Sequence, residues 1–156
     1  MHLGGDEVDT SCWTETPSVQ AWLTSNNLTA DQGYEYFVAR AQQIAHAYGR
    51  DVVGWEEIWD HFGTQLNPST IIEQWLPGST IGPAVVAAGY RLIWATDGVW
   101  YLDGLDVDWE TMYLAEPCFN ISSQYDHLVL GGEGCMWGET VDTSDIEVSP
   151  LMPILH

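Results

Sequence analysis

The spacing of apolar side chains along the chain predicts alternating helices and short strands. From Gln32 to Tyr48 they recur with the 3.6-residue period of an amphipathic helix, and Gly49 follows where that helix would end. Two shorter helices are predicted, one after Thr16 with a proline at its first position and one over 83–88. Strands are predicted in the entry to HLGGDEV and in the runs DVVGW, TIIEQW, YRLIWAT and LVLGGEG.

This order of elements indicates an α/β fold with a parallel sheet. Several of the predicted strands are apolar along their whole length, which is typical of strands covered on both faces. Each strand leads, near its carboxyl end, to a tryptophan, a tyrosine or a carboxylate, and in parallel barrels these ends build the site. About five strands are predicted, three fewer than a closed barrel of eight, and the stretch 97–126 is predicted to be irregular.

Charge and aromatic content restrict the class of protein further. The 156 residues include 23 acidic side chains, three arginines and no lysine, for a net charge of −20. Nucleic acids and anionic membranes are poor partners for such a surface. Disorder does not fit nine Trp, seven Tyr and three Phe. The chain is expected to form one acidic globular domain, suited to work at low pH.

Processing signals are sparse. No apolar run reaches the ~20 residues of a membrane span, and no signal peptide precedes HLGGDEV. Cys12, Cys118 and Cys135 are odd in number, so at least one is free or pairs outside this chain. Asn27 and Asn120 begin glycosylation sequons, which together with the odd cysteine favour a secretory route.

The stretch HLGGDEV, from His2 to Val8, is the strongest candidate for chemistry. Gly4 and Gly5 allow a ligand or another backbone to approach closely. Asp6 and Glu7 follow at once, and adjacent carboxylates oppose each other's ionisation, as proton-transfer chemistry often requires. The alternative is an acidic turn of purely structural origin.

The predicted strand ends together present aromatic walls with a few carboxylates, a combination that suits a neutral sugar. These residues are Asp6, Glu7, Trp55, Trp75, Tyr101, Asp103, Trp137 and Glu139. No phosphate-binding loop or nucleophile elbow is present, and the five histidines lack ligand spacing, so neither metal nor cofactor is expected. The remaining indoles are expected to be core residues: Trp13, Trp22, Trp59, Trp94, Trp100 and Trp109. Glu56 and Glu57 are expected to begin a helix, and Cys135 to be a buried free thiol.

Five motifs in order carry a resemblance to a known family. HLGGDEVDTSCW, VVGWEE, TIIEQW, WYLD and LVLGGEGCMWGE resemble the β-N-acetylhexosaminidases of glycoside hydrolase family 20, of the lysosomal or vacuolar type. The resemblance implies a (β/α)8 barrel, of which this chain would supply about strands 4 to 8. It implies a retaining exo-glycosidase that removes terminal N-acetylglucosamine or N-acetylgalactosamine with help from the substrate's own acetamido group.

The resemblance also implies a role for each candidate. Glu7 matches the general acid/base, Asp6 the residue that holds the acetamido N–H, and Tyr101 the donor to the acetamido oxygen. The indoles would pack around the sugar and the other carboxylates would bind its hydroxyls: Trp55, Trp75, Trp137, Asp103 and Glu139. Expected partners are an N-acetylhexosamine-terminated glycan or a chitin oligomer, with homo- or heterodimers formed by the full-length protein and no nucleic acid or membrane.

The chain departs from the family pattern at both ends. Residues 1–156 are expected to be a partial barrel domain that lacks the first strands and the last helix, where VSPLMPILH stands instead. The family disulfide of Cys12 would have its partner upstream. Five strands of eight leave open edges, so the isolated chain is expected to be poorly soluble and inactive.

Two other functions stay open on the sequence alone. One is a non-catalytic or decayed relative that keeps the aromatic pocket. The other is an endo-acting chitin hydrolase, whose carboxylates would alternate along a strand instead of standing side by side. Neither the choice between gluco and galacto sugars nor the natural substrate follows from these residues.

Overall fold

The computed structural model describes residues 1–104 and 107–139. The chain divides into two compact units, Met1–Ile72 and Glu73–His156. The boundary falls inside strand β2 (Ile71–Gln74). The terminal segment VSPLMPILH, where a departure from the family pattern is expected, lies outside the described residues. No helix in the described part of the chain has the length and apolar character to cross a membrane.

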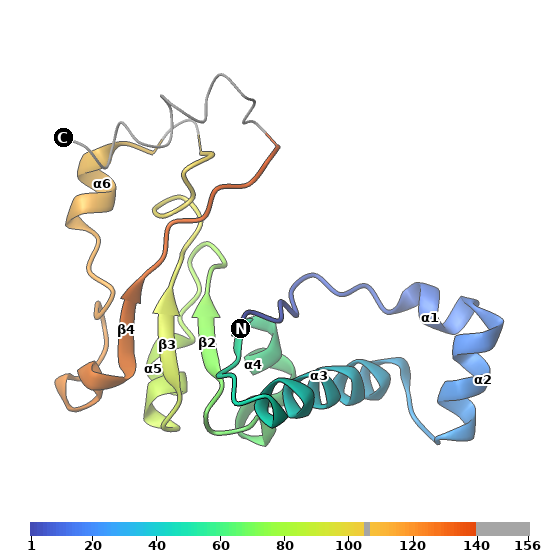
Figure 1. Cartoon of the computed structure of the whole chain (residues 1–156). Helices are drawn as coiled ribbons and strands as arrows, with labels where there is room; N and C mark the ends of the chain where they lie inside the picture. Colours follow the sequence, from blue (N-terminus) through green and yellow to red (C-terminus); the bar gives the residue numbers. More distant parts are fainter. Residues whose placement is uncertain (105–106, 140–156) are drawn as a thin grey trace. The chain divides into compact units, whose positions relative to one another are not determined.

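The first unit is mainly helical (Figure 1). It contains α1 (Ser11–Glu15), α2 (Pro17–Ser25), α3 (Ala30–Ala47), β1 (Val53–Trp55), α4 (Glu57–Phe62), the 3-10 helix η1 (Gly63–Gln65) and the start of β2. Helix α3 begins two residues earlier than the apolar period predicts, because a capping box starts it. The Thr29 hydroxyl accepts from the Gln32 N–H at 3.2 Å, and the Gln32 side chain accepts from the Thr29 N–H at 2.9 Å.

Helix α3 buries one face and exposes another. Tyr34 and Ala45 are buried, whereas Phe37, Ile44 and Tyr48 are 67%, 48% and 80% exposed. The helical period of these side chains is therefore confirmed, but the apolar stripe is wider than the surface that covers it within this unit. Helix α4 begins at Glu57 after Glu56, which confirms that this acidic pair opens a helix.

Strand β1 connects the amino terminus to β2 within the first unit. His2 pairs in parallel with Val53 as an isolated bridge, and the Leu3 N–H donates to the Val53 carbonyl at 2.9 Å. On the other side, the Ile71 N–H donates to the Val52 carbonyl at 2.8 Å. The entry to HLGGDEV was predicted to be a strand, which is wrong as an element. A single bridge forms there, because the chain turns away from β1 at the glycines that follow.

Within the second unit, the end of β2 lies side by side with two further strands (Figure 1). This unit contains the end of β2, α5 (Gly82–Ala87), β3 (Arg91–Trp94), α6 (Trp109–Leu114), the 3-10 helix η2 (Ser123–Leu128) and β4 (Val129–Gly132). The Ala95 N–H donates to the Gln74 carbonyl at 2.8 Å, so β2 lies beside β3. Strands β3 and β4 are parallel, with Leu92 opposite Val129. An α/β fold with parallel strand pairing is therefore confirmed.

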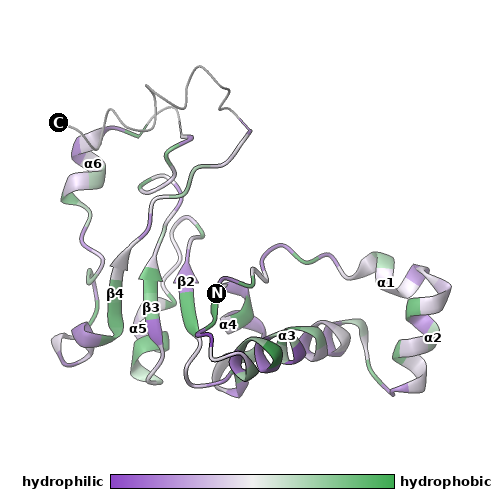
Figure 2. Ribbon diagram, viewed as in Figure 1, coloured by the Kyte–Doolittle hydropathy of each residue, from purple (hydrophilic) through white to green (hydrophobic). Residues whose placement is uncertain are grey.

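The strands differ in how completely they are covered. All four residues of β2 are buried, including two polar ones, whereas residues of β4 alternate and Leu130 is 51% exposed. Figure 2 shows hydrophobic residues concentrated on the strands and on α5, which packs against β3. The prediction of strands covered on both faces thus holds for β2 and is wrong for β4. In the described part of the chain, β4 lies at the edge of the sheet and pairs with β3 alone.

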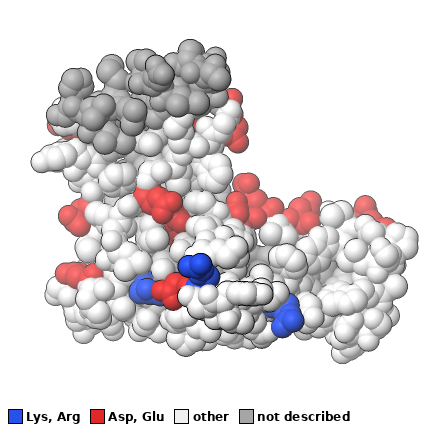
Figure 3. Space-filling model, in the orientation of Figure 1, with Lys and Arg blue, Asp and Glu red and all other residues white. Residues whose placement is uncertain are grey.

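Two further predictions are corrected in detail. The stretch 97–126 is not wholly irregular, because Asp108 caps helix α6 by accepting from the Thr111 N–H at 2.7 Å. Trp22 and Trp109 are 39% and 52% exposed, so these two indoles are not core residues. Figure 3 shows acidic side chains scattered over the visible face with few basic ones among them, in keeping with the composition.

Candidate active site

The acidic loop, residues 4–7, leaves the sheet directly after the His2–Val53 bridge. The Gly4 carbonyl accepts from the Trp55 N–H at 3.1 Å, and the Gly4 N–H donates to Nδ1 of His2 at 3.0 Å. The His2 ring lies against the Trp55 indole, with 4.8 Å between ring centroids. These contacts place the loop at the carboxyl end of β1, the end at which parallel strands present functional groups.

Close packing beneath the loop requires glycine at two positions. Gly5 has φ +106°, and a Cβ there would overlap the side chain of Ile58 from α4. A Cβ on Gly54 of strand β1 would lie 2.5 Å from the Ile58 Cδ1 and 3.1 Å from the Gly4 carbonyl. The loop therefore rests on β1 and α4 with no room for side chains between them.

The two carboxylates of the loop occupy different environments. Asp6 is half-buried, whereas Glu7 is exposed and adopts φ +49°, a conformation that non-glycine residues rarely take. One carboxylate is therefore held near the protein and the other is presented outward. This asymmetry allows two different roles for two adjacent acids.

Tyr34 of α3 fixes the loop from behind. Its hydroxyl donates to the Gly5 carbonyl, and its ring packs on His61 and Phe62 with centroid distances of 5.4 and 5.2 Å. Burial raises the pKa of Tyr34 to about 12, with smaller contributions from the charges of Glu57 and Asp6. In the sequence analysis this tyrosine is only one of the apolar positions of the helical period, and nothing in its spacing pointed to the loop.

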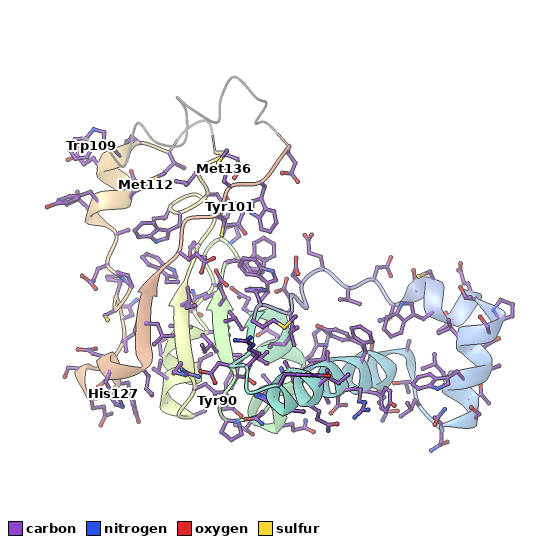
Figure 4. All side chains as sticks on the ribbon, viewed as in Figure 1. Tyr90, Tyr101, Trp109, Met112, His127 and Met136 are labelled. Carbon is purple, nitrogen blue, oxygen red and sulfur yellow. The ribbon has the colours of Figure 1, made fainter. Side chains whose placement is uncertain are left out.

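Three of the predicted aromatic residues come together in the second unit. The rings of Trp75 and Tyr101 are stacked nearly parallel, with 6.3 Å between centroids and 8° between planes. Tyr101 and Trp137 lie 6.1 Å apart at 54°. Tyr101 itself is 9% exposed and follows strand β3 in the chain (Figure 4). We call Trp75, Tyr101 and Trp137 the aromatic cluster.

The backbone around the cluster is tied to the segment after β4. Tyr101 pairs in parallel with Cys135, and the Cys135 N–H donates to the Trp100 carbonyl at 2.9 Å. Burial raises the pKa of Tyr101 above its ordinary value, while a hydrogen bond with Trp137 opposes that rise and nearby acidic groups add to it. The phenol therefore stays protonated over any working pH.

Cys135 is a buried thiol, as the sequence predicts. Burial raises its pKa to about 12, with further contributions from the charges of Glu73, Glu133 and Asp103. Asp103 is half-buried, and its charge acts on this thiol. Among the cysteines, Cys12 is exposed and Cys118 half-buried.

Sequence reasoning missed Glu73 of strand β2. The residue is fully buried, and its charge contributes to the raised pKa values of Cys135 and Tyr101. A glutamate directly after the apolar pair Ile71–Ile72 of a predicted strand was the available signal, because charged residues are rarely buried without a specific environment.

The predicted site residues thus divide between the two units. The first unit holds Asp6 and Glu7 beside Trp55, whose indole is only 8% exposed. The second unit brings together Trp75, Tyr101 and Trp137, and Asp103 acts through its charge on Cys135, which pairs with Tyr101. Glu139 is exposed two residues after Trp137, which is itself 40% exposed. Across residues 1–104 and 107–139, no three His, Cys, Asp or Glu side chains form a cluster able to hold a metal ion.

Solved structures share this fold. An exo-β-N-acetylglucosaminidase of family 20 from Vibrio harveyi, crystallised as an inactive mutant, superposes with a TM-score of 0.80 at 20% identity, over 97% of this chain and 26% of that chain. A Streptomyces plicatus β-hexosaminidase mutant in complex with the product GlcNAc gives 0.66 at 23% identity, over 97% and 30%. At these identities the likeness shows the fold alone.

Sequence comparison carries the relationship further. Beta-hexosaminidase 1 of Arabidopsis thaliana is 51% identical over 145 residues, which cover 92% of this chain and 27% of the relative. Beta-hexosaminidase subunit alpha of Bos taurus is 35% identical over 156 residues, which cover 94% and 29%. The chain thus spans less than a third of the length of these relatives. Residues 1–151 match the catalytic domain of glycosyl hydrolase family 20, and the chain belongs to this family.

Proposed function

We propose that this chain forms the part of a β-N-acetylhexosaminidase that supplies barrel strands 4 to 8, with residues 1–156 as a partial catalytic domain. The full-length enzyme would remove terminal, non-reducing N-acetylglucosamine or N-acetylgalactosamine by retaining, substrate-assisted hydrolysis. The observation that carries this proposal is the family membership, combined with an adjacent Asp–Glu pair presented at the carboxyl end of a strand.

Glu7 would act as the general acid and base. Its exposed side chain suits proton transfer to a leaving oxygen and later from an incoming water. The half-buried Asp6 would hold the acetamido N–H while the amide oxygen attacks the anomeric carbon and positive charge develops on the ring that forms. The different exposure of the two carboxylates supports this division.

Tyr101 would donate its hydroxyl proton to the acetamido oxygen. Its raised pKa keeps that proton on the phenol. Its hydrogen bond with Trp137 leaves the proton available, because an indole N–H can only donate and so must bond to the phenol oxygen.

The remaining candidates would bind the sugar. Trp75 and Trp137 flank Tyr101 in the aromatic cluster and would pack around the acetyl group and the sugar face, with Trp55 as a third indole. Asp103 and Glu139 would accept hydrogen bonds from sugar hydroxyls. No residue in this scheme calls on a metal or a cofactor.

The setting of the enzyme is proposed from its relatives. We infer terminal N-acetylhexosamine on glycans or chitin oligomers as the substrate, and a lysosomal, vacuolar or secreted location. Pairing into dimers is inferred from the subunit naming of the bovine relative. We infer that the 156 residues alone are inactive and poorly soluble, since exposed apolar side chains such as Phe37 and Leu130 need cover.

The test is Glu7→Gln in the full-length protein that contains this chain. Hydrolysis of chitobiose, whose leaving group needs protonation, should fall by about 10²–10⁴, because the general acid is lost. Binding of N-acetylglucosamine, measured by calorimetry, should persist. Unchanged hydrolysis would refute the acid/base role, and absence of hydrolysis in the unaltered full-length protein would favour a non-catalytic relative.

A further inference from the structure

We propose that Tyr34 is a positioning residue for Glu7: its hydroxyl holds the Gly5 carbonyl and thereby fixes the direction in which the acidic loop presents its acid/base. This inference rests on the proposed role of Glu7. Tyr34 lies on α3 and would not contact the sugar itself. It belongs to no sequence motif that the proposed mechanism uses.

The first argument is the peptide group that Tyr34 holds. The Gly5 carbonyl belongs to the peptide bond that joins Gly5 to Asp6, so its orientation sets the path of the next two residues. Within residues 1–104 and 107–139, Tyr34 is the one donor to this carbonyl. Glycine at position 5, with φ +106°, offers little conformational resistance of its own to rotation of that peptide.

The second argument is the space behind the loop. A cavity of about 160 Å³ lies in the first unit, lined by both loop glycines and by Tyr34, Phe37 and Ile58 among others. The loop packs closely on Ile58 but borders this cavity on another side, where it can shift when its tether is lost. A displacement of about 1 Å at an active site can lower a rate by about 10²-fold.

The third argument is the rigidity of Tyr34 itself. The side chain is 4% exposed and its ring packs against both His61 and Phe62, which restricts the position of its hydroxyl. Burial, with smaller contributions from the charges of Glu57 and Asp6, raises the pKa of its hydroxyl, so it remains a donor wherever the enzyme would work. A rigid donor that stays protonated can define the position of the backbone it binds.

The test compares two tyrosines of the same helix in the full-length protein. Tyr34→Phe keeps the ring and its packing but removes the hydroxyl, and Tyr36→Phe is the matched control because Tyr36 is 54% exposed. Each variant is assayed on two substrates. The 4-nitrophenyl glycoside has a good leaving group that needs little acid, whereas chitobiose has a poor one that depends on Glu7.

Misplacement of Glu7 should affect the poor leaving group more. Tyr34→Phe should lower kcat/KM about tenfold or more for chitobiose and only about two- to threefold for the nitrophenyl substrate. Tyr36→Phe should change neither. The ratio of the two rates on one preparation cancels the folded fraction, so partial unfolding of the variant cannot produce this result. Equal losses on both substrates, or no loss, would overturn the proposal.

A double variant separates this proposal from the one on which it rests. In a Glu7→Gln background, Tyr34→Phe should cause little further change in the ratio, since the group it positions is already absent. Independent, multiplying effects would show that Tyr34 acts by another route. If Glu7→Gln alone retained full hydrolysis, the acid/base assignment itself would fail, whatever Tyr34→Phe did.

Discussion

The two units each contain a buried tyrosine, and the two hydroxyls have different hydrogen-bond partners. Tyr34 donates its hydroxyl to the backbone of the acidic loop, whereas Tyr101 lies in the aromatic cluster with its oxygen bonded by Trp137. Burial raises the pKa of both, so both remain neutral donors. What differs is the acceptor: the Tyr34 hydroxyl donates to the Gly5 carbonyl, whereas the Tyr101 hydroxyl is proposed to donate to a ligand. Burial alone therefore does not show that a tyrosine takes part in function. The group that accepts its hydrogen bond decides its role.

Among tests of this difference between Tyr34 and Tyr101, Tyr101→Phe in the full-length protein should have the largest effect on catalysis. If Tyr101 stabilises charge on the acetamido oxygen, kcat should fall by about 10²–10³, as for loss of one oxyanion-type donor. That loss should appear with good and poor leaving groups alike, unlike the loss expected from Tyr34→Phe. Steady-state kinetics on both substrates measure it, and a loss of less than about threefold would contradict the assigned role.

A second effect contrasts the thiols of the two units. In the reduced protein, iodoacetamide should modify exposed Cys12 at least about 100-fold faster than Cys135, because the thiolate is the reactive form and both burial and the raised pKa suppress it. Mass spectrometry of the labelled peptides gives the two rates. The rates should converge in guanidinium, and similar rates in the folded protein would show that the cluster is open to solvent.

The third effect concerns the close packing of the acidic loop. Gly5→Ala should lower the free energy of unfolding by about 2–4 kcal/mol, because the new Cβ meets Ile58 and φ +106° is unfavourable for alanine. Gly49→Ala is the matched control, since Gly49 also has positive φ but faces open space. It should cost only about 1 kcal/mol. Equal costs in urea unfolding would mean that the loop does not rest on Ile58.

The smallest expected effect is on stability at alkaline pH, where ionisation of Tyr34 should lower the melting temperature. Its folded pKa is raised from 10 to about 12, so its contribution to stability is fully present below pH 10 and is lost as the pH rises through about 12. Thermal melting as a function of pH should therefore fall less steeply over this window in Tyr34→Phe, which cannot ionise. Tyrosinate absorbance should show one fewer late-titrating phenol. An unaltered pH profile would place the hydroxyl in water.

Much of the fold could be predicted because local signals were strong. The helical period of α3 and the apolar runs of β2 and β3 each coincide with the observed elements to within a few residues. The misses occurred where local pattern and tertiary contact diverge. The entry at His2 has the composition of a strand but forms one bridge, and α6 depends on a single Asp108 cap within a stretch of turn-forming residues.

For the same reason, some residues of the candidate site could be predicted from the sequence and others could not. The Asp6–Glu7 pair and the aromatic cluster follow predicted strands in the chain. In parallel sheets the residues after strand ends build the site, so these candidates can be found from the sequence alone. Tyr34 and Glu73 could not be found in that way. Tyr34 acts on a backbone carbonyl 29 residues away, and the influence of Glu73 on Tyr101 passes across neighbouring strands.

By itself, the sequence determined the family and the α/β class and singled out Tyr101 with Trp75 and Trp137, because these depend on which residues occur and in what order. Tertiary structure alone decided that Tyr34 supports the loop. It also decided that Asp6 is half-buried while Glu7 is exposed. Burial and hydrogen-bond partners depend on residues that are distant along the chain, and only folding brings those residues together.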